Sequence, residues 1–214
     1  MNIKWLGHAT FLIASDKGIR IINDPYEPNE RLTYGEIKES ADIVTVSHGH
    51  GDHNNVATVG GNPSIVKETG EIKGIMFKAI PSFHDNAGGG QRGDNTIFCF
   101  EVDSIKLCHL GDLGHPLSNE QAAKIGEVDV LMIPVGGNFT IDAAVASQVC
   151  EKLTPRLIIP MHFRNERCPD FPVAGVDDFI NGKSNVTSLE VSEMELTTGV
   201  LPAVAQIVVM KPAL

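Results

Sequence analysis

The chain has 214 residues, and 17 Lys and Arg against 27 Asp and Glu give it a net charge of −10. This charge argues against a general nucleic-acid binder, which needs basic side chains for phosphate contacts, and against docking on an anionic membrane. It is compatible with bound cations, since metal ions take carboxylate and imidazole ligands. The length fits one domain, which we expect to span residues 1–214.

The N-terminal segment lacks a basic region followed by a long apolar run, so we expect no secretory signal. No stretch approaches the 18 apolar residues that a membrane span requires. The four cysteines form no CxxC pair, which argues against a cysteine-rich structural zinc site. We therefore expect a cytoplasmic protein with reduced thiols.

Short apolar runs separated by turn residues predict strands along most of the chain. The predicted strands cover residues 3–6, 10–14, 19–22, 43–47, 75–80, 96–102, 105–110, 130–134 and 157–160. Ser118 and Gln121 form a capping-box pattern that predicts a helix over 119–125. A second helix is predicted over 143–153, and shorter ones over 35–40 and 176–180. Strands that alternate with helices indicate an α/β protein.

Two segments have the same pattern of an aspartate, a buried strand and a glycine turn. One begins at Asp42 and the other at Asp129. A protein built from two similar halves would show this pattern, and so would two unrelated buried strands. The sequence leaves both interpretations open.

A dense group of metal-ligand residue types directly follows the predicted 43–47 strand. Its sequence is His48-Gly49-His50-Gly51-Asp52-His53. The glycines let the backbone coil tightly, so that side chains two residues apart can converge on one ion. Imidazole and carboxylate together suit zinc, iron or manganese. Four such close neighbours cannot all bind one ion well, so the pattern favours two metals.

Three further candidates lie just past other predicted strands: His84, Asp112 and His162. Residues in such positions meet at one edge of an α/β sheet, where these proteins bind ligands. A lone histidine there is more often structural. Three such residues together with the 48–53 cluster favour a metal site.

These motifs in this order, with Asp24 after an earlier strand, resemble the metallo-β-lactamase superfamily over nearly the whole chain. The resemblance implies a four-layer αββα sandwich with two metals at one edge. It implies these ligands: His48, His50 and His84 for the first metal, Asp52, His53 and His162 for the second, and Asp112 between them. It also implies that Asp24 orients a ligand imidazole through the free ring N–H.

The resemblance further implies a metal-dependent hydrolase in which a hydroxide bridging two divalent ions attacks the substrate. Asp52 would orient the hydroxide and accept its proton. We expect zinc, with manganese or iron as alternatives. The compact chain is similar to the branch that includes the ascorbate-phosphate lactonase and the N-acyl phosphatidylethanolamine phosphodiesterase. This predicts a small, anionic phosphate-ester or lactone-like substrate and no nucleic-acid or membrane partner, and leaves the oligomeric state unspecified.

An iron-dependent oxidoreductase similar to a sulfur dioxygenase is the alternative, because such enzymes keep all the histidines. The di-iron branch has Glu where this chain has His50, and it usually carries a flavin domain, which we do not expect in these 214 residues. A non-catalytic metal-binding protein would be expected to have lost a ligand, and none is lost.

Four residues near the expected pocket are weaker candidates. His115 is a candidate catalytic proton donor or anion-binding residue. His8 ends the first predicted strand, and Arg92 lies between glycines where it could clamp a phosphate or carboxylate. Asn138 belongs to a turn that either lines the pocket or simply leads into the next helix. His109, on a predicted strand, is expected to be a core histidine.

Overall fold

The computed structural model describes residues 1–214, and its framework is two β-sheets that face each other. The first sheet has six strands in the order β13 (Glu193–Glu195), β1 (Asn2–Gly7), β2 (Thr10–Ala14), β3 (Arg20–Asn23), β4 (Ile43–Thr45) and β5 (Ser64–Val66). Strands β13 to β3 pair in antiparallel fashion, whereas β3, β4 and β5 run parallel. The parallel strands therefore end at one edge of the sheet.

The second sheet has eight strands in the order β12 (Val186–Ser188), β14 (Gln206–Val209), β11 (Leu157–Met161), β10 (Val130–Pro134), β9 (Ile105–His109), β8 (Asp94–Val102), β7 (Ile75–Phe83) and β6 (Gly70–Ile72). Strands β9, β10, β11 and β14 are parallel neighbours, and β12 pairs parallel with β14. Strands β6 to β9 form an antiparallel meander.

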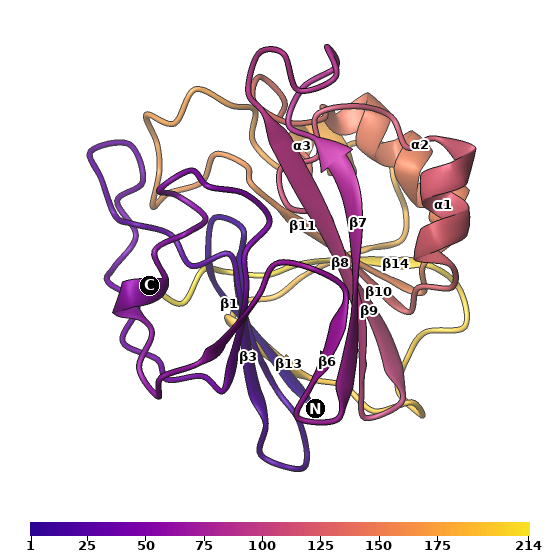
Figure 1. Ribbon diagram of the computed structural model, residues 1–214. Coiled ribbons are helices and arrows are strands. Elements are labelled where there is room, and N and C mark those ends of the chain that lie inside the picture. The colour runs from indigo at the N-terminus through magenta and orange to yellow at the C-terminus, as the bar shows by residue number, and fades with distance from the viewer.

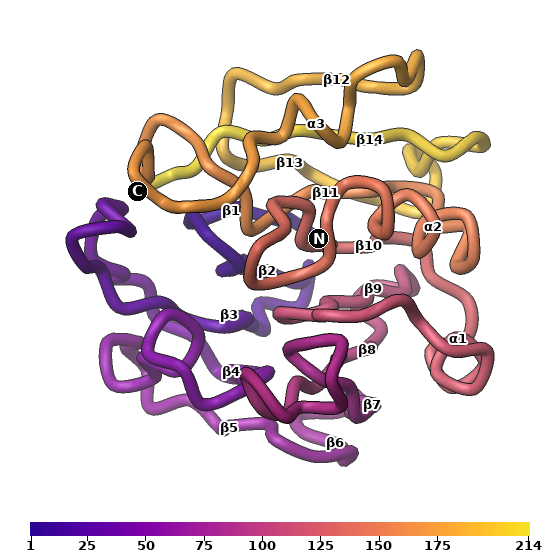
Figure 2. Tube along the Cα trace, turned by 90° about the horizontal axis from the view of Figure 1, so that it is seen from above, coloured from indigo at the N-terminus to yellow at the C-terminus, as the bar shows by residue number.

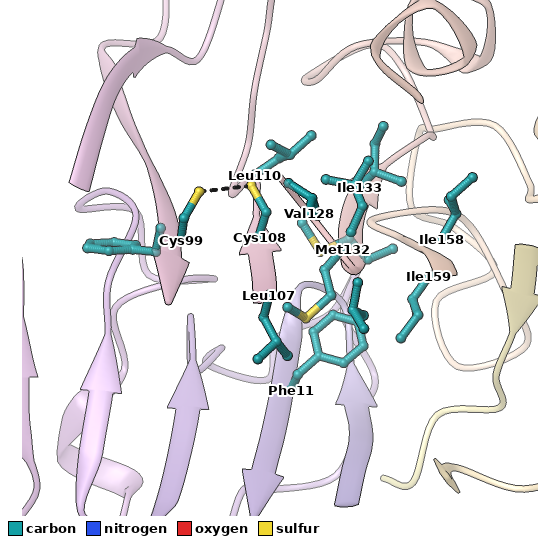
Figure 3. Close-up of a cluster of buried hydrophobic side chains, with 14 of the residues drawn as sticks. Phe11, Cys99, Leu107, Cys108, Leu110, Val128, Met132, Ile133, Ile158 and Ile159 are labelled. Carbon is teal, nitrogen blue, oxygen red and sulfur yellow. Dashed lines mark hydrogen bonds between the residues drawn. The ribbon is translucent and has the colours of Figure 1, made fainter. Parts of the chain in front are cut away.

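The main core contains 45 buried residues, which lie between the two sheets and also under the helices that cover the eight-stranded sheet. Side chains of a strand alternate between its two faces, and on β2 Phe11 and Ile13 point into this core while Leu12 points outward. In Figure 3, Phe11 lies beside Leu107 and Met132 of the opposite sheet. The same view shows Cys99 and Cys108, paired across β8 and β9 as buried free thiols with their sulfur atoms 3.2 Å apart.

Different layers cover the two outer faces (Figures 1 and 2). Helices α1 (Asn119–Ile125), α2 (Ala143–Leu153) and α3 (Asp177–Ile180) lie outside the eight-stranded sheet. Loops within 26–41 and 163–173, with the short 3-10 helix η1 (Val56–Thr58), cover the six-stranded sheet. Fourteen buried residues form a second core under these loops. The predicted α/β sandwich is confirmed, with loops and the short η1 forming the outer layer on the six-stranded sheet.

The helix predicted over 35–40 is wrong, because this stretch has no helical hydrogen-bond pattern and its only regular pairing is an isolated β-bridge from Ser40 to Gly60. Ile37 is its only buried apolar residue, which is too little for an amphipathic helix face. The Ile37 carbonyl instead accepts a hydrogen bond from the Thr58 hydroxyl. The predicted helices over 119–125 and 143–153 are confirmed, with the capping box at Ser118 and an N-cap at Asp142. No helix combines the length and apolar character needed to cross a membrane.

The repeated aspartate pattern has a structural counterpart at the start of β4 and of β10. The Asp42 carboxylate accepts from the Arg20 N–H at 2.9 Å, and the Asp42 N–H donates to the Arg20 carbonyl. Asp129 makes the same pair of bonds with Lys106. Each aspartate thus ties a parallel strand to the preceding one, and the two sheets share this local design.

Candidate metal centre

Polar residues that follow six strand ends meet at one edge of the sandwich. They follow β1, β3, β4, β7, β9 and β11 and are His8, Asp24, the 48–53 segment, His84, Asp112 and His162. In Figure 1 the arrow of β7 points to this edge, where the chain enters the loop that begins at His84. Parallel pairing places the ends of β3 and β4, and those of β9 and β11 on either side of β10, at the same edge. Strands β1 and β7 run the same way as β3 and β9, because one antiparallel strand separates each pair, so residues far apart in sequence become neighbours.

A first donor group consists of His48, His50 and His84. The His48 Nε2 atom lies 3.1 Å from His50 Nδ1. The His84 ring centroid lies 4.8 Å from that of His48 and 5.1 Å from that of His50. One nitrogen from each residue falls within 4.8 Å of the others, so the three imidazoles can converge on a single ion.

A second donor group contains Asp52, His53 and His162, joined by His8. Asp112 lies between the groups, with Oδ2 3.2 Å from His84 Nε2 and 3.3 Å from His162 Nε2. Its Oδ1 atom lies 3.2 Å from His53 Nε2. The Asp112 carboxylate therefore contacts both donor groups.

Several atoms at this centre lack the partner that burial normally requires. His53 Nε2 and Asp112 Oδ1 are buried and form no hydrogen bond of good geometry. Such orphaned polar atoms destabilise a fold unless a ligand satisfies them. Imidazole nitrogens and carboxylate oxygens are donors for divalent transition metals, so the residues present fit metal ions.

The pKa values at the centre follow from burial and from close charges. Burial disfavours the charge on Asp112, but His162 and His53 hold the pKa of its carboxyl well below its usual range. Burial likewise disfavours protonated His53, yet Asp112 and Asp24 raise its pKa well above the usual value. Burial, with the nearby His53, lowers the pKa of His48 to about 3. His48 is thus a neutral donor at pH 7, whereas His53 must lose a proton before a metal binds.

Asp24 anchors two of the histidines and is itself fully buried. Its Oδ2 atom lies 3.0 Å from His53 Nδ1, which leaves Nε2 of that ring facing Asp112. Asp24 also accepts hydrogen bonds from the N–H and hydroxyl of Ser47. The Ser47 hydroxyl in turn lies 2.9 Å from His48 Nδ1. The geometry is that of a carboxylate that orients ligand imidazoles, directly for His53 and through Ser47 for His48.

Sequence reasoning missed Ser47 and also Asn95. The Asn95 side chain accepts from the Asp112 N–H and donates to the Leu110 carbonyl, both at 2.9 Å. It therefore shapes the turn that aims Asp112 at the histidines. A hydroxyl next to His48 was visible in the sequence, but no local signal marks Asn95, which comes from a different strand.

A pocket of about 660 Å³ opens onto the centre. Its lining includes His50, Asp52, His84, Asp112, His162, Arg31, Arg92, Phe139 and Phe171. The Arg92 guanidinium lies 5.5 Å from the centroid of the Phe139 ring, a cation–π contact that steadies it. The structure thus brings Arg92 to the pocket and adds Arg31, which the sequence analysis had not singled out.

Asp85, also missed, organises the loop that carries Arg92. Its carboxylate accepts four backbone N–H bonds between 2.7 and 2.9 Å, from Ala87, Gly89, Gln91 and Arg92. Burial acts against its charge, but these donors lower the pKa of Asp85 to about 2. The glycine-rich loop is therefore folded around one buried carboxylate.

His115 is not brought to the centre, contrary to the prediction of a catalytic role. Its Nε2 accepts from the Phe83 N–H at 3.2 Å, and Nδ1 lies 2.9 Å from the Pro116 carbonyl. It lines a separate pocket together with Pro81 and Phe83 of β7 and Gln121 of α1. His109 is a core histidine as expected, since it is fully buried with Nε2 2.8 Å from the Ala9 carbonyl.

Asn138 and His8 also differ from their expected substrate-binding positions. The Asn138 amide donates to the Pro172 carbonyl at 2.9 Å and holds two loops together, while the next residue, Phe139, lines the pocket. His8 is only 1% exposed and is absent from the pocket lining. It packs instead beside Asp52, with Nε2 3.4 Å from Oδ2.

Comparison with known proteins identifies the class of protein to which this fold and site belong. Residues 2–162 match the family described as a beta-lactamase superfamily domain, and the chain belongs to the metallo-β-lactamase superfamily. A "UPF0173 metal-dependent hydrolase" of Carboxydothermus hydrogenoformans is 30% identical over 208 residues, which cover 83% of this chain and 88% of that protein. More particularly, the chain is a metal-dependent hydrolase of this superfamily.

Solved structures agree on the fold. A Thermotoga maritima protein assigned to the Zn-dependent hydrolases of the superfamily has a TM-score of 0.80 and 36% identity, with 98% of this chain and 97% of that one covered. A diiron β-hydroxylase from Streptomyces venezuelae has a TM-score of 0.53 and 15% identity, covering 75% of this chain and 44% of that one. The second likeness shows the fold alone, because the fold hosts more than one chemistry.

Proposed function

We propose that the chain hydrolyses a small anionic phosphate ester or lactone-like compound at a site for two divalent ions. The observation that carries the proposal is the position of Asp112 between two donor groups. Its carboxylate lies within 3.2–3.3 Å of His84 from the first group and of His53 and His162 from the second. One carboxylate placed against two ligand sets is the arrangement that a binuclear site needs.

The proposed ligands are His48, His50 and His84 for one ion, Asp52, His53 and His162 for the other, and Asp112 for both. Zinc suits these nitrogen and oxygen donors, as do manganese and iron. Two such ions, when bound, supply Lewis acidity for the scissile group and lower the pKa of water.

The protein's own groups bind the substrate and handle its protons. Asp52 faces the pocket with 29% of its side chain exposed. Burial opposes its charge, but contact with His8 and the nearby His53 lower the pKa of its carboxyl, so it is ionised at pH 7 and can take up a proton at Oδ1 or Oδ2. Arg92 and Arg31 are placed to bind the anionic end of the substrate, and the Phe171 ring excludes water from one wall.

The test combines metal analysis with a hydrolysis panel. We expect two ions per chain and turnover of bis-p-nitrophenyl phosphate or of a lactone. His50→Ala should lower kcat/KM on the order of a hundredfold or more, because it removes a ligand. Lys78→Ala, an exposed change on β7, is the control and should leave turnover unchanged.

Two results would contradict the proposal. One is a fully metallated protein that hydrolyses no phosphodiester, lactone or thioester. The other is an iron-loaded protein that consumes oxygen in the presence of a thiol, which would favour the oxidoreductase alternative.

A further inference from the structure

His8 occupies a special place in the turn between β1 and β2. Its backbone has φ 52°, in the left-handed region that most residues avoid. Its carbonyl accepts hydrogen bonds from Trp5 Nε1 at 3.1 Å and from the His162 N–H at 3.2 Å. The turn is thereby fixed against the backbone of a proposed ligand, and it directs the His8 side chain toward the metal centre.

The His8 imidazole is buried among the second donor group. Its ring centroid lies 4.3 Å from that of His162 and 4.9 Å from that of His53. Its Nε2 atom lies 3.4 Å from Asp52 Oδ2, and that nitrogen is buried without a hydrogen bond of good geometry. One ligand atom from each of these four residues falls within 4.8 Å of the others.

We propose that His8 is a direct ligand of the ion in the second position, in addition to Asp52, His53 and His162. This rests on the proposed binuclear site, and it assigns to His8 a role different from the substrate contact expected from sequence. A buried, unpartnered nitrogen among three other donors is satisfied by an ion better than by a distant substrate.

The consequence is an asymmetric centre. The second position then has four protein ligands besides Asp112, whereas the first has three, His48, His50 and His84. More donors hold an ion more tightly and leave fewer positions for water or substrate. We infer that the second ion is the more tightly held of the two and is lost later during chelation, and that the first position is the more open to substrate.

The experiment uses the full chain loaded with Co²⁺. His8→Asn is the informative variant, because asparagine tolerates the left-handed backbone that alanine does not. His115→Asn is the matched control, since it removes a histidine that lies outside the centre. Binding is followed by competition with a chelator, and the ligated imidazoles are counted from their paramagnetically shifted, exchangeable N–H proton signals.

We expect His8→Asn to lower the affinity for one of the two ions on the order of 10–100-fold and to remove one shifted N–H signal. His115→Asn should change neither the affinity nor the number of signals. An unchanged number of shifted signals in His8→Asn would overturn the proposal, even with weakened binding, because His8 would then act only by holding Asp52. Unchanged affinity would overturn it as well.

The two proposals can fail separately. Absence of hydrolysis by wild-type protein would count against the proposed function, while loss of an N–H signal in His8→Asn would still support His8 as a ligand. His8→Gly, which also tolerates the left-handed backbone, provides a second variant, and circular dichroism identifies any variant that fails to fold.

Discussion

Single buried carboxylates hold the loops of this protein in place. Asp24 ties β3 to Ser47 and His53, and Asp85 gathers four backbone N–H groups of the loop after β7. Neither residue depends on a side chain of the substrate pocket for these bonds. The ligand imidazoles are therefore positioned by hydrogen bonds that already exist in the protein.

The Asp42 carboxylate predicts how the free energy of unfolding depends on pH. Its carboxylate accepts from the Arg20 N–H and from Lys73 Nζ at 2.7 Å, and the Lys73 bond is the main cause of its lowered pKa. Because the pKa of Asp42 is lower in the folded protein, its ionised carboxylate stabilises the fold fully at a pH above 3.8, the pKa in the unfolded chain. This stabilisation is lost as the pH falls through the lower pKa of the folded state. Asp42→Asn should therefore cost about 1 kcal/mol at pH 7, reduced by solvent screening.

Urea unfolding of wild type and Asp42→Asn between pH 7 and pH 3 tests this. The difference in free energy of unfolding should be constant down to about pH 4 and shrink below it. Asp170→Asn, at an exposed carboxylate, serves as the control. A difference that grows on acidification would contradict the assigned sign.

At the scale of elements, the short turns after the strands decide where the ligands point. Gly111, between β9 and Asp112, has φ +55°, and a Cβ there would lie 2.4 Å from Asn95 Oδ1 and 2.6 Å from Ser47 Cβ. Gly18 has φ +85°, but no atom lies within 4 Å of its added Cβ. Alanine substitutions at these two glycines therefore separate the energetic cost of backbone strain from the cost of steric overlap.

Gly18→Ala should cost about 1–2 kcal/mol of unfolding free energy from left-handed strain alone. Gly111→Ala should cost about 1–3 kcal/mol more, because the methyl group displaces Asn95 and Ser47, and it should also weaken metal binding. Thermal or urea unfolding with metal titration measures both effects. Equal losses in the two variants would show that the turn after β9 tolerates the added methyl.

At the scale of the whole molecule, one core joins the two sheets. The 45-residue cluster runs from Met1 to Met210 and draws on both sheets. We therefore expect residues 1–214 to unfold as one cooperative unit. Fluorescence of Trp5, the only tryptophan and 1% exposed on β1, should change at the same urea concentration as the far-ultraviolet circular dichroism.

This measurement uses metal-free protein, because bound ions add a linked equilibrium to the transition. A refolded sample that retraces the curve is the control for reversibility. Two separated transitions, one for each probe, would contradict a single domain and would indicate that the sheets unfold independently.

The sequence by itself determined the elements and most of the donor set. Apolar runs predicted the long strands, and Ser118 with Gln121 predicted α1 with its observed bounds, because these signals are local. The edge strands β5, β6, β12 and β13, and the short β14 beside β12, escaped prediction, since they are three or four residues long and mostly exposed or half-buried. The 48–53 segment was visible because its residues are adjacent.

Only the tertiary structure decided which distant residues meet. Asn95 acts on the backbone of the turn after a different strand, and His8 reaches Asp52 because β1 ends at the same edge as β4. His115 lies close to Asp112 in sequence yet faces away. The physical reason is that strand pairing, not sequence distance, places the ends of strands together, and side-chain direction there depends on turns whose hydrogen bonds come from elsewhere in the chain.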